Sequence, residues 1–344
     1  MKRLSFILAV AVNTAYGVGE SIPLTNDNNA VWYGSISVGT PPNSFNVVFD
    51  TGRADLILPG KSCKSGCDGH TQYEIGASST AQELGKSFNL AVGEGSVISG
   101  EQVTDTVSIG GFTASEQTLG IATSYPPNFQ IQRFPADGIL GMAFGSISAF
   151  PADSVMETLK SQNKEIPSVF AFKLAETDSE LMVGGTNDKL YTGGFTNVPV
   201  TKKGYWQTTL DAIVVNEKPV FTKLEAVIDT GSTTISLTLE QAQEFYATIG
   251  GKDASAKAGP GFYSFPCESF PSVALTFGGK SFKMSEKTFS LGKLSQGSNE
   301  CVGSIVAKND AGMDAVVIGT AFLQNVYTAF DLGNNQIGFA DLAR

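Results

Sequence analysis

The chain of 344 residues is long enough for two domains or for one large two-lobed unit. Charged residues make up only 16%, against roughly 25% in an average protein, and 38 glycines and 14 prolines are spread along the chain, so the composition predicts a mainly β fold with large buried faces and many turns. The net charge of −10 argues against nucleic acid and anionic membranes as partners.

The first 17 residues have the pattern of a secretory signal peptide. Lys2 and Arg3 supply the charged start, residues 4–12 form the apolar core, and Ala15-Tyr16-Gly17 offers a small-x-small cleavage site. This core is too short to span a bilayer, and no other stretch approaches the required length. We therefore expect a secreted protein with a signal peptide at 1–17 and no membrane anchor. The alternative for this segment is an N-terminal strand.

Two apolar stretches end on the same tripeptide. Residues 30–60 alternate apolar and polar positions and predict a strand, a hairpin and a second strand. In this region, Asp50-Thr51-Gly52 follows the apolar run 45–49. Much later in the chain, Asp229-Thr230-Gly231 follows the apolar run 226–228. A single carboxylate at the end of a buried strand would be costly to ionise. Two copies predict that the aspartates face each other and share one proton.

The spacing of these motifs indicates an internal duplication. Asp50 and Asp229 are 179 residues apart, and each has an apolar-apolar-glycine signal downstream. Ile139 begins the first signal, 89 residues after Asp50, and Val317 begins the second, 88 residues after Asp229. One Asp-Thr-Gly alone is best explained as a turn. Two copies with matched partners predict two similar lobes that meet at the aspartates.

The cysteines and the single histidine bear on metal binding and on triad chemistry. Four cysteines in a secreted chain predict two disulfides. A thiolate zinc site is disfavoured, because Cys63 and Cys67 are separated by three residues instead of two. His70 excludes a multi-histidine zinc site and leaves a Ser-His-Asp triad only one candidate base. We expect no metal, no cofactor, and an exposed His70 in a loop.

The rest of the chain contains further strands and two helices. A β-rich block is predicted at 86–110, and a lobe boundary near 193–200. A short helix is predicted within 151–164, and a longer one runs over 238–249, where Thr238 and Gln241 form a capping box and Gly250 ends the helix. The last strands are expected at 326–331 and 337–340. The apolar helix residues are interpreted as core: Val155, Met156, Leu159, Ala242, Phe245, Tyr246 and Ile249.

These motifs together resemble the pepsin-like aspartic endopeptidases, most of all the secreted fungal ones. The resemblance covers nearly everything after residue 21 and includes Tyr33–Pro42, Ala136–Met142, Gly204–Gln207 and Tyr327–Asp331. It implies a bilobal, mainly β fold with an N-terminal lobe at 18–195 and a C-terminal lobe at 196–344. It further implies hydrolysis of extended peptides or unfolded proteins at acid pH, by a secreted or vacuolar monomer.

The resemblance also assigns roles residue by residue. Asp50 and Asp229 would be the catalytic pair that holds a water molecule, and Thr51 and Thr230 would brace the two loops. The implied disulfides are Cys63–Cys67 and Cys267–Cys301. Residues 91–96 would form the flap, a hairpin tip that closes over the substrate. The implied substrate-binding residues are Gly52, Val92, Gly93, Glu94, Gly231, Ser232 and Thr233.

The sequence departs from this family pattern at three positions. Arg53 stands where serine is usual, Val92 where the flap tyrosine is usual, and Ile57 where tryptophan is usual. Within reach of Asp50, Arg53 would lower the pKa of that carboxyl by ~1–3 units and favour ionisation of both aspartates. Alternatively, the long side chain extends outward into solvent.

Two functional hypotheses remain open on the sequence. The first is an active aspartic endopeptidase. The second is a weakened or inactive peptidase-like protein that keeps the cleft and binds without cutting, which Arg53 and Val92 favour. Ser21-Ile22-Pro23-Leu24 already resembles a mature start, so either an activation segment is missing from this sequence or the protein is not made as a zymogen. A β-sandwich carbohydrate binder fits only the composition.

Overall fold

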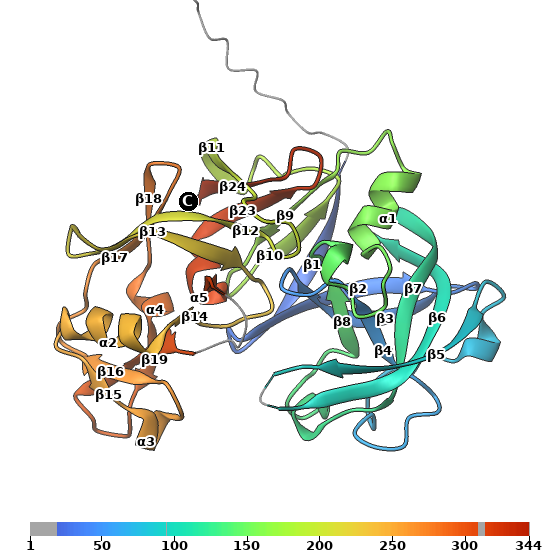
Figure 1. Ribbon diagram of the computed structural model, residues 1–344, viewed down its shortest axis with the longest axis horizontal. Coiled ribbons are helices and arrows are strands. Elements are labelled where there is room, and N and C mark those ends of the chain that lie inside the picture. Colours follow the sequence, from blue (N-terminus) through green and yellow to red (C-terminus); the bar gives the residue numbers. More distant parts are fainter. Residues whose placement is uncertain (1–18, 94, 309–313, 344) are drawn as a thin grey trace, which may run out of the picture.

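A computed structural model describes residues 19–93, 95–308 and 314–343. The predicted signal peptide at 1–17 lies outside these ranges. The described chain is mainly β and bilobal, as predicted. Figure 1 shows the N-terminal half on the right and the C-terminal half on the left, with strands from both ends of the chain between them. Within the described ranges, no helix is long and apolar enough to cross a membrane.

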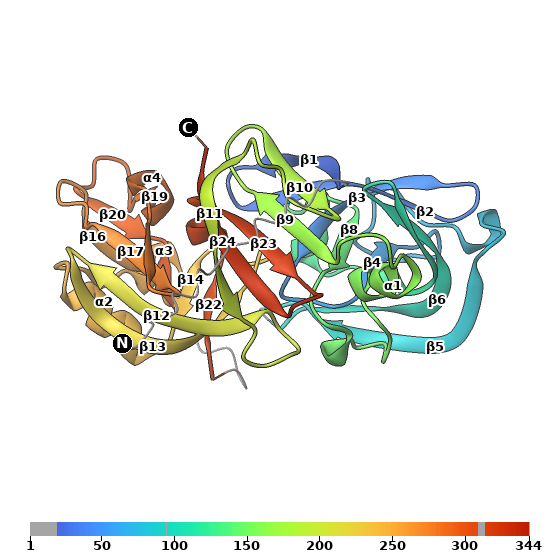
Figure 2. The same cartoon turned by 90° about the horizontal axis from the view of Figure 1, so that it is seen from above.

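The largest sheet in the described chain has 13 strands and runs through both halves. In spatial order its strands are β11 (Tyr191–Pro199), β24 (Gln336–Leu342), β23 (Val326–Asp331), β9 (Val169–Lys173), β10 (Ser179–Val183), β1 (Glu20–Asp27), β2 (Val31–Val38), β3 (Asn43–Asp50), β8 (Gly138–Gly141), β4 (Leu56–Pro59), β7 (Phe112–Ser124), β6 (Val97–Ile109) and β5 (Gln82–Ala91). The first six come from three distant stretches of the chain, so their pairing joins the two halves (Figure 2).

Two further sheets belong to the C-terminal half. The seven-stranded sheet has the order β18 (Lys280–Lys283), β17 (Val273–Phe277), β12 (Gln207–Val215), β13 (Lys218–Ile228), β22 (Val316–Ile318), β14 (Ile235–Leu237) and β21 (Ile305–Ala307). The four-stranded sheet has the order β15 (Lys252–Asp253), β16 (Tyr263–Pro266), β20 (Glu300–Gly303) and β19 (Ser290–Lys293). Together these sheets form the framework of the half that carries Asp229.

The helices are short and lie between strands. They are α1 (Val155–Gln162), α2 (Leu239–Ala247), α3 (Ser255–Ala258), α4 (Glu286–Phe289) and α5 (Thr320–Leu323), with single 3₁₀ turns at Ile75–Ala77, Pro127–Phe129 and Gly145–Ile147. Both predicted helices are present. The predicted capping box of α2 forms, since the Gln241 backbone amide donates to the Thr238 hydroxyl at 3.2 Å. Helix α2 ends two residues before the predicted Ile249, which instead bonds back to the Tyr246 carbonyl in a tightened last turn.

The duplication predicted from the spacing is visible in the strand pairing. In the first half, β3 runs parallel to β8, with Asp50 opposite Gly141, and β4 pairs antiparallel with β8. In the second half, β13 runs parallel to β22, with Ile228 opposite Ile318, and β14 pairs antiparallel with β22. Each downstream apolar-apolar-glycine signal is therefore the strand beside an Asp-Thr-Gly strand.

The glycines that end β8 and follow β22 lie under the two Asp-Thr-Gly loops. A Cβ on Gly141 would lie 2.5 Å from the Ala54 carbonyl carbon and from the Asp55 nitrogen. A Cβ on Gly319 would approach the carbonyl oxygens of Ser232 and Thr234 closer than any real Cβ contact. Only glycine lets these strands pass so close to the loops, which explains why the signal ends on glycine in both repeats.

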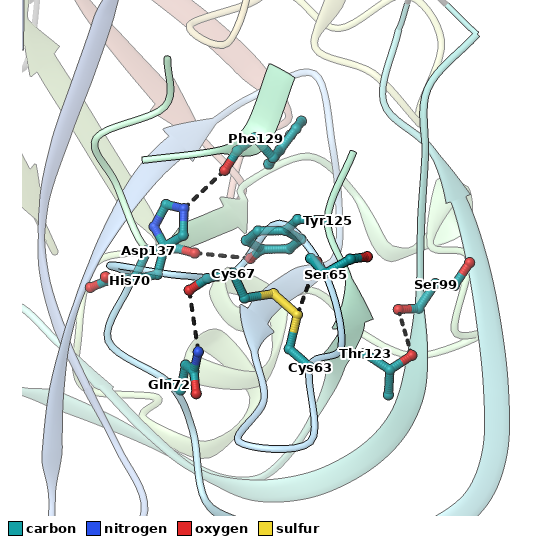
Figure 3. Close-up of a disulfide and its surroundings, with 10 residues drawn as sticks. All are labelled: Cys63, Ser65, Cys67, His70, Gln72, Ser99, Thr123, Tyr125, Phe129 and Asp137. Atoms are coloured by element: carbon teal, nitrogen blue, oxygen red, sulfur yellow. Dashed lines mark hydrogen bonds between the residues drawn. A yellow bond between two sulfur atoms is a disulfide. The ribbon is translucent and has the colours of Figure 1, made fainter. Parts of the chain in front are cut away.

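Both expected disulfides form, but His70 differs from its prediction. Cys63 pairs with Cys67 and Cys267 pairs with Cys301. His70 was expected to be exposed and is buried at 7% exposure, so that prediction is wrong. Figure 3 shows its ring against Tyr125, with Nε2 2.9 Å from the Phe129 carbonyl oxygen. The loop composition gave no sign of this, because residues 125–129, far along the chain, fold over the ring.

The two disulfides should differ in their contribution to stability. Cys267–Cys301 closes a loop with a sequence separation of 34, and Cys63–Cys67 one of only 4. The constraint on the unfolded chain grows with loop length, so replacing both cysteines of the long loop by alanine should lower the free energy of unfolding by ~4 kcal/mol, against ~2 kcal/mol for the short loop. Urea unfolding of both double variants tests this ranking. Equal losses would contradict the loop-entropy argument.

Candidate active site

The two Asp-Thr-Gly loops are bound to each other by crossed hydrogen bonds of their threonines. The Thr51 amide donates to the Thr230 hydroxyl at 3.0 Å, and the Thr230 amide donates to the Thr51 hydroxyl at 2.9 Å. Each hydroxyl also donates across to the other strand: Thr51 to the Ile228 carbonyl at 2.9 Å, and Thr230 to the Phe49 carbonyl at 2.6 Å. Both threonines are buried, so water does not compete for these bonds.

The glycine of each tripeptide packs against the aspartate of the other loop. A Cβ on Gly52 would lie 2.7 Å from the carboxyl carbon and oxygens of Asp229. A Cβ on Gly231 would lie even closer to the carboxyl group of Asp50. The absence of a side chain at these two positions therefore allows the carboxyl groups of Asp50 and Asp229 to meet at the junction of the halves.

Each aspartate accepts one backbone hydrogen bond from its own loop and has one side-chain partner there. Oδ1 of Asp50 accepts from the Gly52 amide, and Oδ1 of Asp229 accepts from the Gly231 amide, both at 2.8 Å. Oδ2 of Asp229 accepts from the Ser232 hydroxyl at 2.7 Å. The corresponding oxygen of Asp50 instead pairs with Nε of Arg53 at 3.1 Å. The two repeats therefore differ in the third partner of the carboxylate.

Burial and the neighbouring aspartate decide the protonation of Asp50. Desolvation is the largest effect, followed by the negative charge of Asp229, and together they raise the pKa of Asp50 to about 7. Arg53 and the Gly52 amide lower this pKa by less, and a hydrogen bond with Asp229 adds to the upward shift. The Asp50 carboxyl thus keeps its proton through most of the acid range.

Two expectations about Arg53 are corrected by this arrangement. The side chain does not extend into solvent, because it is 28% exposed and pairs with Asp50. It also does not cause both aspartates to ionise together in acid, because the net pKa shift of Asp50 is upward. Arg53 reduces that shift without reversing it. The loss of a full hydration shell and the repulsion between two carboxylates outweigh a single partly exposed cation.

The predicted flap lies at the turn between β5 and β6. The Val92 amide donates to the Ser96 carbonyl at 2.9 Å, and the Ser96 amide donates to the Gly93 carbonyl at 2.8 Å. Gly93 has φ of +87°, which glycine adopts without strain. Glu94 lies outside the described residues. Val92 is buried in an apolar cluster that includes Ile57. Two of the three positions that depart from the family pattern therefore contribute packing here.

The chain is similar to known proteins over most of its length. A family model described as eukaryotic aspartyl protease matches residues 31–342. The chain belongs to this family. An aspartic protease of Phaffia rhodozyma is 37% identical over 328 residues, covering 94% of this chain and 79% of its own length. Cathepsin D of Homo sapiens is 35% identical over 353 residues (93% and 83%), and vacuolar protease A of Neurospora crassa is 34% identical over 340 residues (94% and 81%). As an aspartyl protease, the protein is an aspartic-type endopeptidase.

In this aspartyl protease, the predicted site residues do not all lie at the carboxyl pair. Asp50, Asp229, both threonines, both glycines and Ser232 meet there. The Thr233 hydroxyl instead donates to the Ala30 carbonyl at 3.2 Å, so it links its loop to the turn between β1 and β2. This contact gives Thr233 a structural role, and its predicted role in substrate binding stays a prediction.

Trp206 supports the site of this aspartyl protease and was not predicted to do so. Its indole nitrogen donates to the Met142 carbonyl at 3.0 Å, and its own carbonyl accepts from the Ile228 amide at 3.0 Å. The side chain is fully buried and lies against Phe144, Phe170 and Phe330. It thus connects the loop after β8 with the strand that carries Asp229. In the sequence, Trp206 belongs to the Gly204–Gln207 motif, which indicated the family resemblance but not this supporting role.

The crossed threonine bonds predict a sharp difference between two substitutions. Thr51→Val keeps the side-chain shape but leaves the buried Thr230 amide and Ile228 carbonyl without partners. The free energy of unfolding should therefore fall by roughly 2–5 kcal/mol, at ~1–3 kcal/mol for each unsatisfied group. Thr51→Ser keeps the hydroxyl and should cost much less. Urea unfolding of both variants at the same pH measures this. If Thr51→Val proves as stable as Thr51→Ser, these bonds do not hold the loops.

Proposed function

We propose that this aspartyl protease cuts extended peptides in acid, with Asp50 and Asp229 as the catalytic pair. The observation that carries the proposal is the juxtaposition of two carboxyl groups, where burial and the charge of Asp229 raise the pKa of Asp50 to about 7. Each carboxyl is fixed by a backbone amide and a side chain of its own loop. An arrangement of this kind supplies one base and one acid side by side.

The chemistry follows from the shared proton. A water molecule held between the carboxyls gives a proton to the ionised group as its oxygen attacks the peptide carbonyl. The protonated carboxyl donates to the carbonyl oxygen, and a proton then passes to the leaving nitrogen, which breaks the C–N bond. This is general acid–base catalysis without a covalent intermediate. Gly52, Gly231 and the flap residues Val92, Gly93 and Glu94 are proposed to contact the substrate, and Ser232 to orient Asp229.

We further propose that the lobes 18–195 and 196–344 contribute one aspartate each, and that the substrate lies between them under the flap. An unfolded protein or extended peptide is the expected substrate, and the protein is expected to act as a monomer. Its location is proposed to be extracellular or vacuolar. The supporting observations are the pattern at residues 1–17, the two disulfides, and relatives named cathepsin D and vacuolar protease A.

A second candidate is a binding protein that keeps the cleft without cutting. The ion pair of Arg53 with Asp50 favours it, because a cation on a catalytic carboxylate stabilises the ionised ground state. The raised pKa of Asp50 favours the peptidase. If neither wild type nor the Arg53→Ser/Val92→Tyr variant cuts, and both bind a peptide that mimics the transition state, the binding function is the correct one.

Substitution of either aspartate should abolish hydrolysis. Asn in place of Asp50 or Asp229 keeps the size of the side chain but can neither accept the water's proton nor share one. We expect Asp50→Asn and Asp229→Asn to lose at least ~10³-fold in kcat on unfolded haemoglobin or casein at acid pH. Thermal unfolding of each variant controls for loss of the fold. Substantial turnover in either variant would place the chemistry elsewhere.

The pH profile should report the charge of Arg53. With the pKa of Asp50 at about 7, activity should fall as the pH rises through about 7, where the shared proton is lost. Arg53 favours the ionised form, so Arg53→Ser should let the pair hold its protons to higher pH. Both limbs of the kcat/KM profile should then move upward, by on the order of one pH unit.

Arg53→Lys is the matched control for this prediction, since it keeps the positive charge. Its profile should stay closer to wild type than that of Arg53→Ser when all three are measured on one chromogenic peptide. Superimposable profiles for wild type and Arg53→Ser would show that the ion pair has no influence on the reacting carboxyls.

A further inference from the structure

We propose that Arg53 is a positioning residue that ties the flap to Asp50. Its guanidinium contacts two elements at once: Nε pairs with Oδ2 of Asp50 at 3.1 Å, and Nη1 donates to the Ala91 carbonyl at the base of the flap at 3.0 Å. The contact itself is independent of catalysis. Its importance for peptide hydrolysis rests on the proposed function of Asp50.

The internal duplication provides the comparison that reveals this role. Ser232 and Arg53 occupy equivalent positions in the two repeats, and both contact Oδ2 of their aspartate. The serine side chain is short and can donate one hydrogen bond, which Asp229 accepts. The planar fork of Arg53 has five donors and is long enough to engage a second acceptor. Among the hydrogen bonds of the described residues, only the first repeat therefore has a connection from its aspartate, through this side chain, to a neighbouring hairpin.

The flap has little else to fix its position. Ala91 is the last residue of β5 and pairs with Val97 across the hairpin. A Cβ on Gly93 or Gly95 would meet no atom within 4 Å, so these glycines of the tip stand clear of the described chain. Among the described residues, the bond from Arg53 is the one hydrogen bond that links 91–97 to the chain outside their own hairpin. Packing of Val92 is the other restraint.

The two contacts of Arg53 must therefore depend on each other. A carboxylate at Oδ2 orients the guanidinium and strengthens its hydrogen bonds. Movement of the flap away from Asp50 separates the Ala91 carbonyl from the Arg53 guanidinium, which Asp50 holds in place. Removing either end should loosen the other.

Hydrogen exchange of the substrate-free protein tests this tie without relying on activity. Peptides that cover residues 86–97 should exchange on the order of tenfold faster in Arg53→Gln than in wild type. Arg53→Lys should behave like Arg53→Gln, because one ammonium group cannot replace a planar fork between two acceptors. Asp50→Asn should accelerate exchange by a smaller factor. Peptides from residues 207–228 should be unchanged in all variants and report an intact fold.

The decisive measurement is the combination of the two substitutions. In Arg53→Gln, adding Asp50→Asn should cause no further acceleration of flap exchange, because the tie is already broken. Ser232→Ala is the matched control: it removes the equivalent contact from Asp229 and should leave flap exchange unchanged, because Ser232 makes no hydrogen bond with the described flap residues. Unchanged exchange in Arg53→Gln, or independent effects of the two substitutions, would overturn the proposal.

This proposal and the proposed function can fail separately. If wild type cuts peptides and the aspartate variants do not, while flap exchange ignores Arg53, the tie is wrong and the peptidase assignment stands. If the exchange results hold but wild type cuts no peptide, the tie stands and the peptidase assignment falls. In active protein, loss of the tie should also change kcat and KM by different factors, whereas a purely structural weakening would lower the amount of active protein alone.

Discussion

The active site depends on the crossed hydrogen bonds between Thr51 and Thr230. They bring together two strand ends that lie 179 residues apart in the sequence, and they do so without any charged group. Because both threonines are buried, water does not compete for these hydrogen bonds in the folded protein. The position of each carboxyl group is then set by backbone geometry, and the glycine that follows each threonine leaves the space the opposite carboxyl needs.

Electrostatics at the junction result from three opposing effects of unequal size. Desolvation and the second carboxylate favour a bound proton, and Arg53 opposes them from a partly exposed position. The first two prevail because Asp50 is buried, while the charge of Arg53 is partly screened by solvent. A basic residue can therefore lie beside a buried carboxyl group and reduce the upward shift of its pKa without reversing it.

The duplicated motifs made the central fold predictable, because matched spacing directly reports that two strands have equivalent neighbours. The four short signals predicted the duplication, and the structure adds that β3 pairs parallel with β8 and β13 parallel with β22. The burial of His70 could not be predicted, since it depends on residues 125–129 folding over the loop. For Arg53, the sequence predicted the possible contact but not its net effect, which required the burial of Asp50. Trp206 gave a recognisable motif without revealing which strands it connects.

The sheet that joins the two halves has a consequence for biosynthesis. Strand β9 pairs with β10 on one side, but its neighbour on the other side, β23, and the neighbour of β11, β24, both come from the last 20 or so residues to be translated. Until then the edges of β9 and β11 are open, and the two halves lack the β-ladders that join them. A ribosome-bound chain thus carries both aspartates without holding them in their final relation. The order of synthesis itself delays the appearance of a functional cleft until the polypeptide is nearly complete.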